Sequence, residues 1–446
     1  MNITILGTGY VGLVTGLSLA DIGHNVICVD NDQEKIEMLR NCEIPFYEDG
    51  VSELLKKNLS KNINFSEDLQ KSLYDSEILF IAVGTPFDGN KIDLTYIEDV
   101  SKEIGKCLKE MNSYKTIVVK STVIPGTTLN VVAKIIEVNS GLKRNKGFGI
   151  GMCPEFLREG TAVYDSMNPD RIVIGAENTK CSKLIKKVFS SFDCTDIIET
   201  STTTAELIKY TSNSFLASLI SFSNEISNYC MRFDNVDVKD ILNGLHLDKR
   251  LSPIINGERI TPEIIEFIKA GCGFGGSCFP KDVKALIADG DNKKVDMKLL
   301  KSVIDINENQ PNKLIDLFKK HHTTTKNHKV GVLGLSFKPG TDDMRESPSI
   351  KLIYELKKLE TIVYAYDPVA VKNAKKLFAD LDINYVNNMK EVVNNADSIF
   401  IVTSWNEFNK LPDVLNSLKK APLIIDGRRM LDKNKIKKYE GIGLTS

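Results

Sequence analysis

A glycine-rich turn near the start of the chain has the spacing of a dinucleotide-binding loop. Gly7, Gly9 and Gly12 follow a short apolar run and open an apolar helical pattern. Glycines there permit a tight turn and let a pyrophosphate approach the N–H groups of a helix start. Asp30 ends the next apolar run, where a carboxylate binds a ribose diol and repels a 2′-phosphate. The pattern favours a dinucleotide site over a glycine-rich turn that binds no ligand, and it predicts NAD rather than NADP as the dinucleotide. Lys35 is either a solvated lysine or a further ligand of the cofactor.

A second glycine-rich loop surrounds Cys278. Pro280 suits the first turn of a helix, which places Cys278 just before a positive helix end, with Lys281 and Asp282 directly after it. That setting favours a nucleophilic thiolate. Most intracellular cysteines are only buried apolar groups, and Cys272, which has no such partners and no zinc-ligand spacing to Cys278, is expected to be one of them. Cys278 is therefore the candidate nucleophile.

Two carboxylates four residues apart follow an apolar run. Glu155 and Glu159 share a face if this stretch is helical, and like charges at that spacing are costly unless they serve a purpose. The alternative is a solvated face on which Arg158 relieves the repulsion. The segment alone does not favour either interpretation.

Lys209 and Asn213 are also four residues apart, within a long apolar-periodic stretch. A lysine among apolar neighbours is either a surface lysine with a buried stem or an inward cation beside an oxyanion. The pattern alone favours the surface lysine.

The elements that must position these residues alternate between strands and helices. Residues 2–6, 13–23 and 25–30 predict strand, helix and strand. Further continuous apolar runs predict strands buried on both faces of a parallel sheet, at 77–86, 116–126, 148–156 and 170–176. The first 200 residues are therefore expected to form a doubly wound α/β domain.

The pattern changes after residue 200. Residues 203–233 carry apolar residues only at helical intervals, which predicts one long central helix. The strand and glycine-turn pattern then restarts, with runs at 329–343, 361–368, 396–405 and 422–429. We expect an α/β fold in which two Rossmann-like doubly wound sheet domains are joined by a long central helix and a helical middle domain. The expected divisions are residues 1–200, 201–310 and 311–446.

Composition excludes several classes of protein. The 446 residues are 42% hydrophobic and 26% charged, which fits about three globular domains and excludes disorder, collagen and coiled coil. Lys and Arg total 58 against 59 Asp and Glu, so the charge predicts neither nucleic acid nor a membrane as partner. Nine irregularly spaced cysteines, Cys194 among them, argue against a disulfide framework. A soluble cytoplasmic protein without a metal site is expected.

Several motifs resemble one enzyme family along essentially the whole chain. They are GTGYVG at the start, VKSTVIPGTT (119–128), PEFLREGTA (154–162), GFGGSCFPKD (273–282) and GLSFKPGTDDMRESPS (334–349). In this order they resemble the UDP-glucose/GDP-mannose dehydrogenases. The resemblance implies an NAD-binding Rossmann domain, a long helix at a dimer interface and a C-terminal nucleotide-binding domain. It also implies oxidation of a primary alcohol to a carboxylate with two NAD, in a homodimer or a larger homo-oligomer.

The resemblance assigns catalytic roles to six residues. They are Cys278 as nucleophile, Asp282 as base or water-orienting acid, Lys209 as the cation for oxyanions, Asn213 as its partner, Glu155 as acid/base in thioester hydrolysis and Thr122 as a water-binding hydroxyl. It thereby favours the inward position of Lys209 and a functional role for Glu155 over the surface alternatives.

The same resemblance implies two sets of binding residues. For NAD these are Gly7, Gly9, Tyr10, Val11, Gly12, Asp30, Lys35, Thr85, Thr122, Glu159 and Lys281, with Arg345 reaching a cofactor across a subunit contact. For the sugar nucleotide they are Glu155, Phe156, Leu157, Lys209, Asn213, Phe274, Gly275, Phe279, Phe337, Lys338 and Arg428. Rings and cations are groups that a uridine diphosphate would need.

One departure concerns the substrate. The segment between Arg250 and the Cys278 loop is longer than is usual in UDP-glucose enzymes, so the arginine that crosses to the substrate is Arg250 or Arg259. UDP-glucose, oxidised to UDP-glucuronate, is the expected substrate. GDP-mannose and a UDP-N-acetylhexosamine are the alternatives within the same chemistry, and an inactive sugar-nucleotide-binding protein is a remote one.

Overall fold

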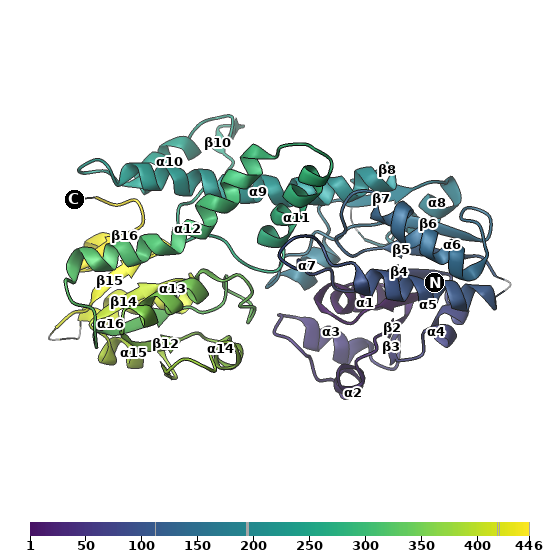
Figure 1. Ribbon diagram of the computed structural model, residues 1–446, viewed down its shortest axis with the longest axis horizontal. Helices are drawn as coiled ribbons and strands as arrows, with labels where there is room; N and C mark the ends of the chain where they lie inside the picture. Colours follow the sequence, from purple (N-terminus) through teal and green to yellow (C-terminus); the bar gives the residue numbers. More distant parts are fainter. Residues whose placement is uncertain (112, 193–195, 417, 419, 446) are drawn as a thin grey trace. The chain divides into compact units, whose positions relative to one another are not determined.

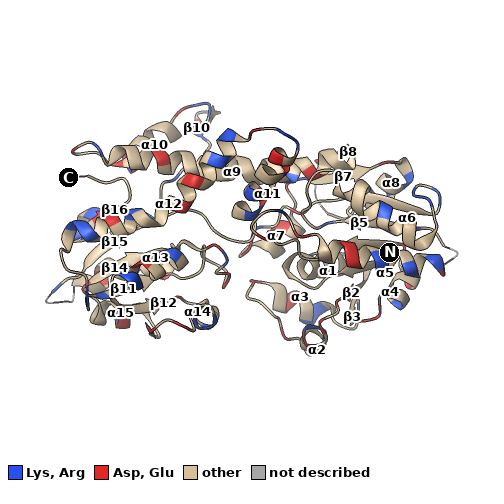
Figure 2. Cartoon of the chain, in the orientation of Figure 1, with Lys and Arg blue, Asp and Glu red and all other residues tan. Residues whose placement is uncertain are grey.

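The computed structural model of the chain describes residues 1–111, 113–192, 196–416, 418 and 420–445, so Cys194 lies outside the described residues. The chain forms two compact units, Met1–Ser212 and Asn213–Ser446. Each unit is built around one mainly parallel sheet, drawn in purple to teal and in green to yellow in Figure 1. Figure 2 shows basic and acidic residues interspersed over the elements of both units.

The sheet of the first unit has the order β3-β2-β1-β4-β5-β6-β7-β8. All neighbours are parallel except β6 and β7. Short buried runs rich in β-branched residues, such as KTIVV in β5, form it. The strands are β1 Asn2–Leu6, β2 Asn25–Val29, β3 Ile63–Ser66, β4 Ile78–Ile81, β5 Lys115–Val119, β6 Phe148–Met152, β7 Ile172–Ala176 and β8 Ile197–Thr200.

Helices cover both faces of this sheet. Neighbouring residues of β4 face opposite ways, since Phe80 packs with Leu13 and Leu17 of α1 while Leu79 packs with Ile104 of α5. The helices are α1 Tyr10–Asp21, α2 Gln33–Arg40, α3 Val51–Asn58, α4 Leu69–Asp75, α5 Thr95–Lys109, the π-helix η1 Thr128–Ala133, α6 Lys134–Ser140, α7 Ala162–Met167 and α8 Thr179–Val188. The long helix predicted over 203–233 is α9, Thr202–Cys230.

The second unit repeats the strand order in its sheet, β13-β12-β11-β14-β15-β16, with every pair parallel. Its two faces again bury separate clusters, Phe400 with Phe318 of α12 on one side and Ile399 with Val392 of α15 on the other. The strands are β11 Lys329–Leu333, β12 Ile362–Tyr366, β13 Ile383–Tyr385, β14 Ser398–Ile401, β15 Leu423–Asp426 and β16 Tyr439–Gly441.

Helices also dominate the part of this unit that precedes its sheet. The helices of the unit are α10 Val238–His246, α11 Phe279–Asn292, α12 Lys298–His321, α13 Pro348–Lys358, α14 Val371–Leu377, α15 Met389–Asn395 and α16 Leu411–Asn416, with the 3₁₀ turns η2 Glu263–Phe267, η3 Asn406–Lys410 and η4 Lys433–Lys435. A small hairpin of β9 Ile254–Ile255 and β10 Glu258–Arg259 lies in the long segment before α11. The predicted fold class is confirmed: two Rossmann-like sheets and a helical region between them in sequence. The division at residues 200 and 310 stays a prediction.

Candidate active site

The first glycine-rich turn connects β1 directly to α1. Gly7 has a φ of +102°, and α1 begins at Tyr10. A Cβ on Gly12 would lie 1.9 Å from the Gly7 carbonyl oxygen, so the turn and the helix can pack only with glycine there. A Cβ on Gly9 would meet nothing within 4 Å, and no side chain caps the start of α1. The turn lies where the strand order reverses between β1 and β4, and its open helix end fits a pyrophosphate.

Asp30 follows β2 and lies beside this turn. One oxygen accepts hydrogen bonds of 2.7 Å from both the backbone N–H and the hydroxyl of Thr8. Its other oxygen accepts a bond from the N–H of Asp32. Lys35 lies 3.9 Å from Asp30 and 3.3 Å from Asp32 and is half-buried. The structure thus brings the acid to the glycine turn, and the donor set suits a dinucleotide.

Other predicted cofactor residues border the same turn. The Tyr10 hydroxyl donates to Glu48, and burial, reinforced by the carboxylates of Glu48, Glu159 and Glu155, raises the pKa of Tyr10. Val11 packs on the core of the first unit. The Thr85 hydroxyl donates 2.7 Å to the carbonyl of Thr122, which joins the loops after β4 and β5.

Lys209 and Glu155 form a buried ion pair within the first unit. The ammonium lies 2.9 Å from the carboxylate, and the two side chains are 4% and 5% exposed. Burial raises the pKa of Glu155, but the Lys209 ammonium, the N–H of Leu157 and the Lys120 ammonium together hold it below its usual range. The surface position that the pattern alone favoured for Lys209 is therefore wrong. Whether a side chain on a central helix faces inward depends on what packs against it, which periodicity does not encode.

The condition under which Glu155 and Glu159 would share a face, a helix over residues 154–159, is not met. The segment is irregular, and a helix begins only at Ala162. Glu155 bends back to accept the Leu157 N–H, and Arg158 pairs with Asp165 at 2.6 Å rather than separating two stacked carboxylates. Glu155 is buried, whereas Glu159 is half-buried in the following turn.

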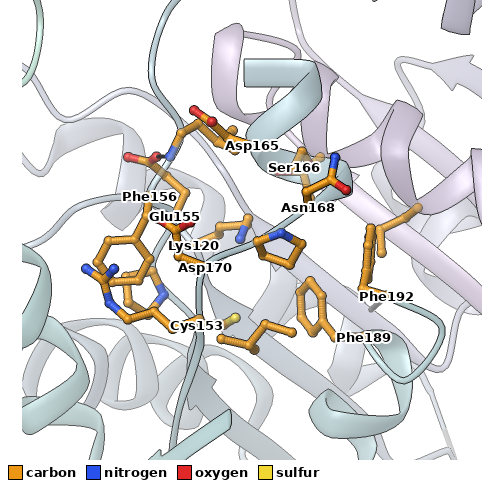
Figure 3. A pocket seen from close by; sticks show the side chains of 17 residues that line it. Lys120, Cys153, Glu155, Phe156, Asp165, Ser166, Asn168, Asp170, Phe189 and Phe192 are labelled. Atoms are coloured by element: carbon orange, nitrogen blue, oxygen red, sulfur yellow. Dashed lines mark hydrogen bonds between the residues drawn. The ribbon is translucent and has the colours of Figure 1, made fainter. Parts of the chain in front are cut away.

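The ring of Phe156 lies beneath two cations of the first unit. The Arg171 guanidinium is 4.0 Å from its centre and the Lys209 ammonium is 5.5 Å away. Both Phe156 and Leu157 are half-buried. Figure 3 shows Phe156 and Glu155 among the residues that line a small cavity beside them.

Cys278 is the N-cap of α11 in the second unit, and Pro280 lies in the first turn as predicted. Its side chain is partly buried, with the Ser277 hydroxyl 3.6 Å from the sulfur. Asp282 follows one turn later and is 1% exposed. Cys272, in contrast, lies in the hydrophobic core of this unit, and burial raises its pKa, as expected of a packing cysteine.

Asp282 is held by two of the predicted residues. The Asn213 side-chain amide donates to it at 2.6 Å, and the Lys281 ammonium pairs with it at 2.6 Å. Asn213 lies in the α9 segment of the second unit and is buried. The structure therefore gathers Asn213, Lys281 and Asp282 one helical turn from the thiol of Cys278.

The Cys278 loop is fixed from the sheet side of the second unit. The Arg428 guanidinium donates to the carbonyls of Val402 and Gly273 at 2.6 and 2.9 Å. A Cβ on Gly275 would lie 2.3 Å from the carbonyl oxygen of Glu346, and the Gly276 N–H donates to the Arg345 carbonyl. These contacts bring Arg428, Gly275 and Arg345 to one loop.

Aromatic rings from the same region accompany this loop. Phe274 and Phe279 form an edge-to-face pair with centres 6.0 Å apart. A Cβ on Gly276 would lie 2.7 Å from the Phe337 ring, over which the Lys338 ammonium lies at 5.7 Å. These rings provide a surface on which a base can stack.

The two candidate arginines of the long segment differ in their partners. Arg250 forms a bidentate pair with Asp248 and its side chain is 89% exposed. Arg259 donates to the carbonyls of Leu247 and Ser252 and so closes the loop before the hairpin. The Arg345 guanidinium is bidentate with Asp343.

Sequence reasoning missed three buried charged residues of the first unit. Glu48 accepts from Tyr10 and from the N–H groups of Gly160 and Ala162, and so ties the glycine turn to the Glu159 turn. Glu206 accepts from the amides of Gly126 and Thr128. Lys120 lines the cavity beside Glu155. Only Lys120 had a signal, because a lysine directly after the apolar residues Ile117, Val118 and Val119 of a buried strand is unusual.

Within the described residues, no helix combines the length and the apolar character that a membrane span requires. No three or more His, Cys, Asp or Glu side chains among the same residues gather as metal ligands would.

Three family models match the chain: the NAD-binding domain of the UDP-glucose/GDP-mannose dehydrogenase family at residues 1–193, its central domain at 203–309 and its UDP-binding domain at 331–433. A UDP-glucose 6-dehydrogenase of Bacillus subtilis, YwqF, is 40% identical over 96% of this chain and 93% of its own. A UDP-glucose 6-dehydrogenase of Rickettsia conorii is 38% identical over 98% of this chain and 97% of its own.

Solved structures agree. A UDP-glucose dehydrogenase from Pyrobaculum islandicum superposes with a TM-score of 0.90 at 34% identity, covering 99% of this chain and 98% of that one. A UDP-D-ManNAc dehydrogenase from Pyrococcus horikoshii superposes with a TM-score of 0.82 at 27% identity, covering 99% of both chains.

Proposed function

Because the chain belongs to the UDP-glucose/GDP-mannose dehydrogenase family, we propose that Cys278 is the nucleophile of its reaction. The activity is the NAD-dependent oxidation of UDP-glucose, whose primary alcohol becomes the carboxylate of UDP-glucuronate. The observation that supports the nucleophile is its position at the N-terminus of α11, one turn before the buried Asp282. A helix start favours the thiolate over the thiol.

We assign the first oxidation to the cation of the first unit. Lys209 is buried beside Glu155, so its ammonium is poised to stabilise the alkoxide formed when the alcohol loses its proton. NAD, when bound, accepts the hydride from that carbon. Asn213 orients Asp282 through the 2.6 Å hydrogen bond, and Asp282 takes the proton directly or through water.

The second oxidation requires a covalent intermediate. The Cys278 thiolate adds to the aldehyde carbon and gives the oxyanion of a thiohemiacetal; transfer of a second hydride from that carbon to a second NAD leaves a thioester. Glu155, held ionised by Lys209, then removes a proton from water as the water attacks the thioester and the C–S bond breaks. Thr122 binds that water. Two NAD are reduced for each alcohol oxidised.

Binding roles follow from the two sheets. We propose that the Gly7–Gly12 turn binds the pyrophosphate of NAD and that Asp30 binds its ribose, with Tyr10, Val11, Lys35, Thr85, Thr122, Glu159, Lys281 and Arg345 as further cofactor residues. For the sugar nucleotide we propose Phe156, Leu157, Phe274, Gly275, Phe279, Phe337, Lys338 and Arg428, with Arg259 or Arg250 at the sugar. The three predicted segments would then hold NAD, the nucleophile and the nucleotide in turn.

The sugar has a specific competitor. The superposition on a UDP-D-ManNAc dehydrogenase favours a UDP-N-acetylhexosamine as the second candidate. A panel of UDP-glucose, GDP-mannose and UDP-N-acetylated sugars, assayed for NADH, separates these substrates. Two NADH per UDP-glucose are expected, and activity only with another sugar would overturn the choice. No NADH with any of them would indicate a binding protein.

Substitution of the nucleophile tests the mechanism. Cys278→Ser should bind UDP-glucose and lose steady-state oxidation by orders of magnitude, because a hydroxyl at this position is a poor nucleophile. Cys272→Ser is the matched control from the same loop and should retain activity, since that side chain lies in the core. Near-normal turnover by Cys278→Ser would refute the assignment.

We further propose a homodimer in the cytoplasm. Phe215, Phe222 and Tyr229 recur every seven residues on α9 and are 53%, 47% and 64% exposed, which forms an apolar stripe of the kind that dimers bury. Eight free cysteines among the described residues fit a reducing compartment. Sedimentation should show a dimer that Phe222→Glu dissociates.

A further inference from the structure

A cavity of about 60 Å³ lies behind Glu155, entirely within the first unit. Figure 3 shows the rings of Phe189 and Phe192 on one side of it and Lys120, Glu155 and Asp170 on the other. A site for one water molecule needs roughly 10–15 Å³ on this measure, so the cavity has room for more than one. Its polar members make it suited to water rather than to an apolar guest.

Lys120 is the unusual member of this lining. It follows β5 directly and is 6% exposed. Among the described residues, no carbonyl or carboxylate lies within hydrogen-bonding distance of its ammonium, whose recorded neighbour is the Phe189 ring, 5.6 Å from it. The Lys120 ammonium is not one of the fully buried polar atoms that lack a partner among the described residues, so it keeps access to the cavity, where water completes the hydration that a ring face replaces only in part.

Another lysine at the opposite end of β5 shows what a satisfied buried ammonium requires. Lys115 is 5% exposed, and its ammonium donates to the carbonyls of Tyr74 and Ser76 at 2.7 and 2.6 Å. The two lysines are almost equally buried and lie at the two ends of β5, Lys115 as its first residue and Lys120 directly after its last. Within the described ranges, only Lys115 has carbonyl acceptors. Lys120 must find its acceptors in the cavity.

The positive charge of Lys120 also lowers the pKa of Glu155. Its ammonium is one of the cations that hold the pKa of Glu155 below the usual range, after Lys209. The surrounding wall of Cys153, Phe189 and Phe192 is apolar, so this interaction is weakly screened. Lys209 already pairs directly with the carboxylate, and Lys120 therefore acts through the cavity and not as a second direct partner.

We propose that this cavity is a water-binding pocket in which Lys120 holds the water that hydrates Glu155, making Lys120 a positioning residue for thioester hydrolysis. The inference rests on the proposed function of Glu155 and Cys278. In this step the attacking water gives one proton to Glu155, its oxygen forms the new bond to the carbonyl carbon, and the sulfur of Cys278 leaves as thiolate. Lys120 keeps Glu155 ionised before that transfer, and both oxidations precede it.

Lys120→Met tests this by separating oxidation from hydrolysis. Rapid mixing of the whole enzyme with saturating UDP-glucose and NAD should still give a burst of two NADH per Cys278. Steady-state turnover should fall at least about ten-fold, as expected for loss of a charge that supports a general base. Intact-mass measurement after acid quench should show the uronyl thioester on Cys278, and the acid limb of the kcat profile should move to higher pH.

Two variants serve as controls. Lys115→Met removes the matched lysine and should lower the melting temperature without changing the ratio of burst to steady state. Lys120→Arg keeps the charge and should restore most of the turnover. If Lys120→Met does not fold, Lys120→Gln is measured in its place with the same expected outcomes.

The results that would contradict the role of Lys120 differ from those that would contradict the proposed function. A burst and a steady state that slow together, or unchanged turnover with no acyl adduct, would overturn the role of Lys120. Failure of the proposed function itself would appear in the unsubstituted enzyme, as one NADH per sugar or as full activity of Cys278→Ser.

Discussion

The two sheets share one strand order, yet the acid that follows the second strand has a different environment in each. Asp30 follows β2 and accepts three hydrogen bonds, from two groups of Thr8 and from the N–H of Asp32. Asp367 follows β12, is 2% exposed and accepts from six groups: the N–H of Leu335, Ser336, Val369 and Ala370, the Ser336 hydroxyl and the Trp405 indole. A carboxylate has about four lone-pair sites. Asp30 therefore retains acceptor capacity for a ligand, and Asp367 does not.

The first turns differ in the same way. Gly7 leads within three residues into α1, whose start has no side-chain cap. Gly334 leads instead into a loop that carries Phe337, and α13 begins only at Pro348 with its N-terminus capped by Ser347. With the same strand order, the helix that follows the first turn has an uncapped N-terminus in the first unit and a capped one in the second. Strand order alone therefore does not identify a dinucleotide site, whereas the turn and the acceptor capacity of the acid do.

The largest expected effect comes from the glycines of these two turns. In Gly12→Ala the new Cβ would lie 1.9 Å from the Gly7 carbonyl oxygen, so the turn must move and NAD affinity should fall at least about 100-fold, or roughly 2.7 kcal/mol. In Gly334→Ala the Cβ would lie 2.4 Å from Thr403 at a φ of +92°, which should destabilise the second unit and leave NAD affinity unchanged. Calorimetric titration with NAD and thermal unfolding measure both. Wild-type affinity for NAD in a folded Gly12→Ala variant would contradict the assignment of the cofactor site to the first turn.

The two acids give the next effect. Asp30→Asn should weaken NAD binding about ten-fold, or ~1.4 kcal/mol, and relax the rejection of NADP, because the charge facing the ribose is lost. Asp367→Asn should lower the melting temperature, since buried N–H groups lose an acceptor at about 1–3 kcal/mol, with NAD affinity intact.

The contrary outcome is equally clear for this pair. If Asp367→Asn weakened NAD binding as much as Asp30→Asn, the second sheet would carry a cofactor function that its saturated acid argues against. Titrations with NAD and NADP on both variants, each checked for folding by circular dichroism, decide between the two.

Much of the first sheet could be predicted because its signals are local. Gly7, Gly9, Gly12 and Asp30 lie within about 25 residues of one another, and every predicted apolar run overlaps a strand. The runs at 77–86 and 116–126 extend well beyond the ends of β4 and β5, and the sequence did not predict β3 or β8. The run predicted over 148–156 ends as a strand at Met152, because the chain beyond it bends to bury Glu155.

The remaining features depend on contacts between distant segments. Trp405 reaches Asp367 from 38 residues away, and Lys209 pairs with Glu155 across more than 50, so neither contact leaves a periodic signal. The role of Glu48 could not be predicted for the same reason, since its partners Tyr10 and Gly160 are distant from it in the sequence. Motifs identified the chemistry, and packing decided which side chains are buried beside it.

The smallest expected effect concerns histidines at the opposite end of the two sheets. In the first unit, buried His24 bonds to the Val188 carbonyl, and burial lowers its pKa. In the second, His322 and His328 both lie 3.0 Å from the Ser398 hydroxyl, with ring centres 4.1 Å apart. Burial lowers the pKa of both histidines, and Asp397 opposes this shift in each. The pKa of His322 is lowered further by His328, His321 and Lys438. The pKa of His328 is lowered further by Lys420.

A pKa lowered by folding means that the unfolded chain takes up protons first as the pH falls below about 6.5. Each histidine then contributes stability that is present at neutral pH and lost on acidification. With one such group near the first sheet and two near the second, His24→Gln should leave most of the fall in melting temperature between pH 7.5 and 5. His328→Gln, which removes one lowered histidine and the repulsion that His328 exerts on His322, should flatten it more, although His321 and Lys438 still face the remaining imidazole. A steeper profile in His328→Gln than in His24→Gln would reverse the expected contrast between the sheets.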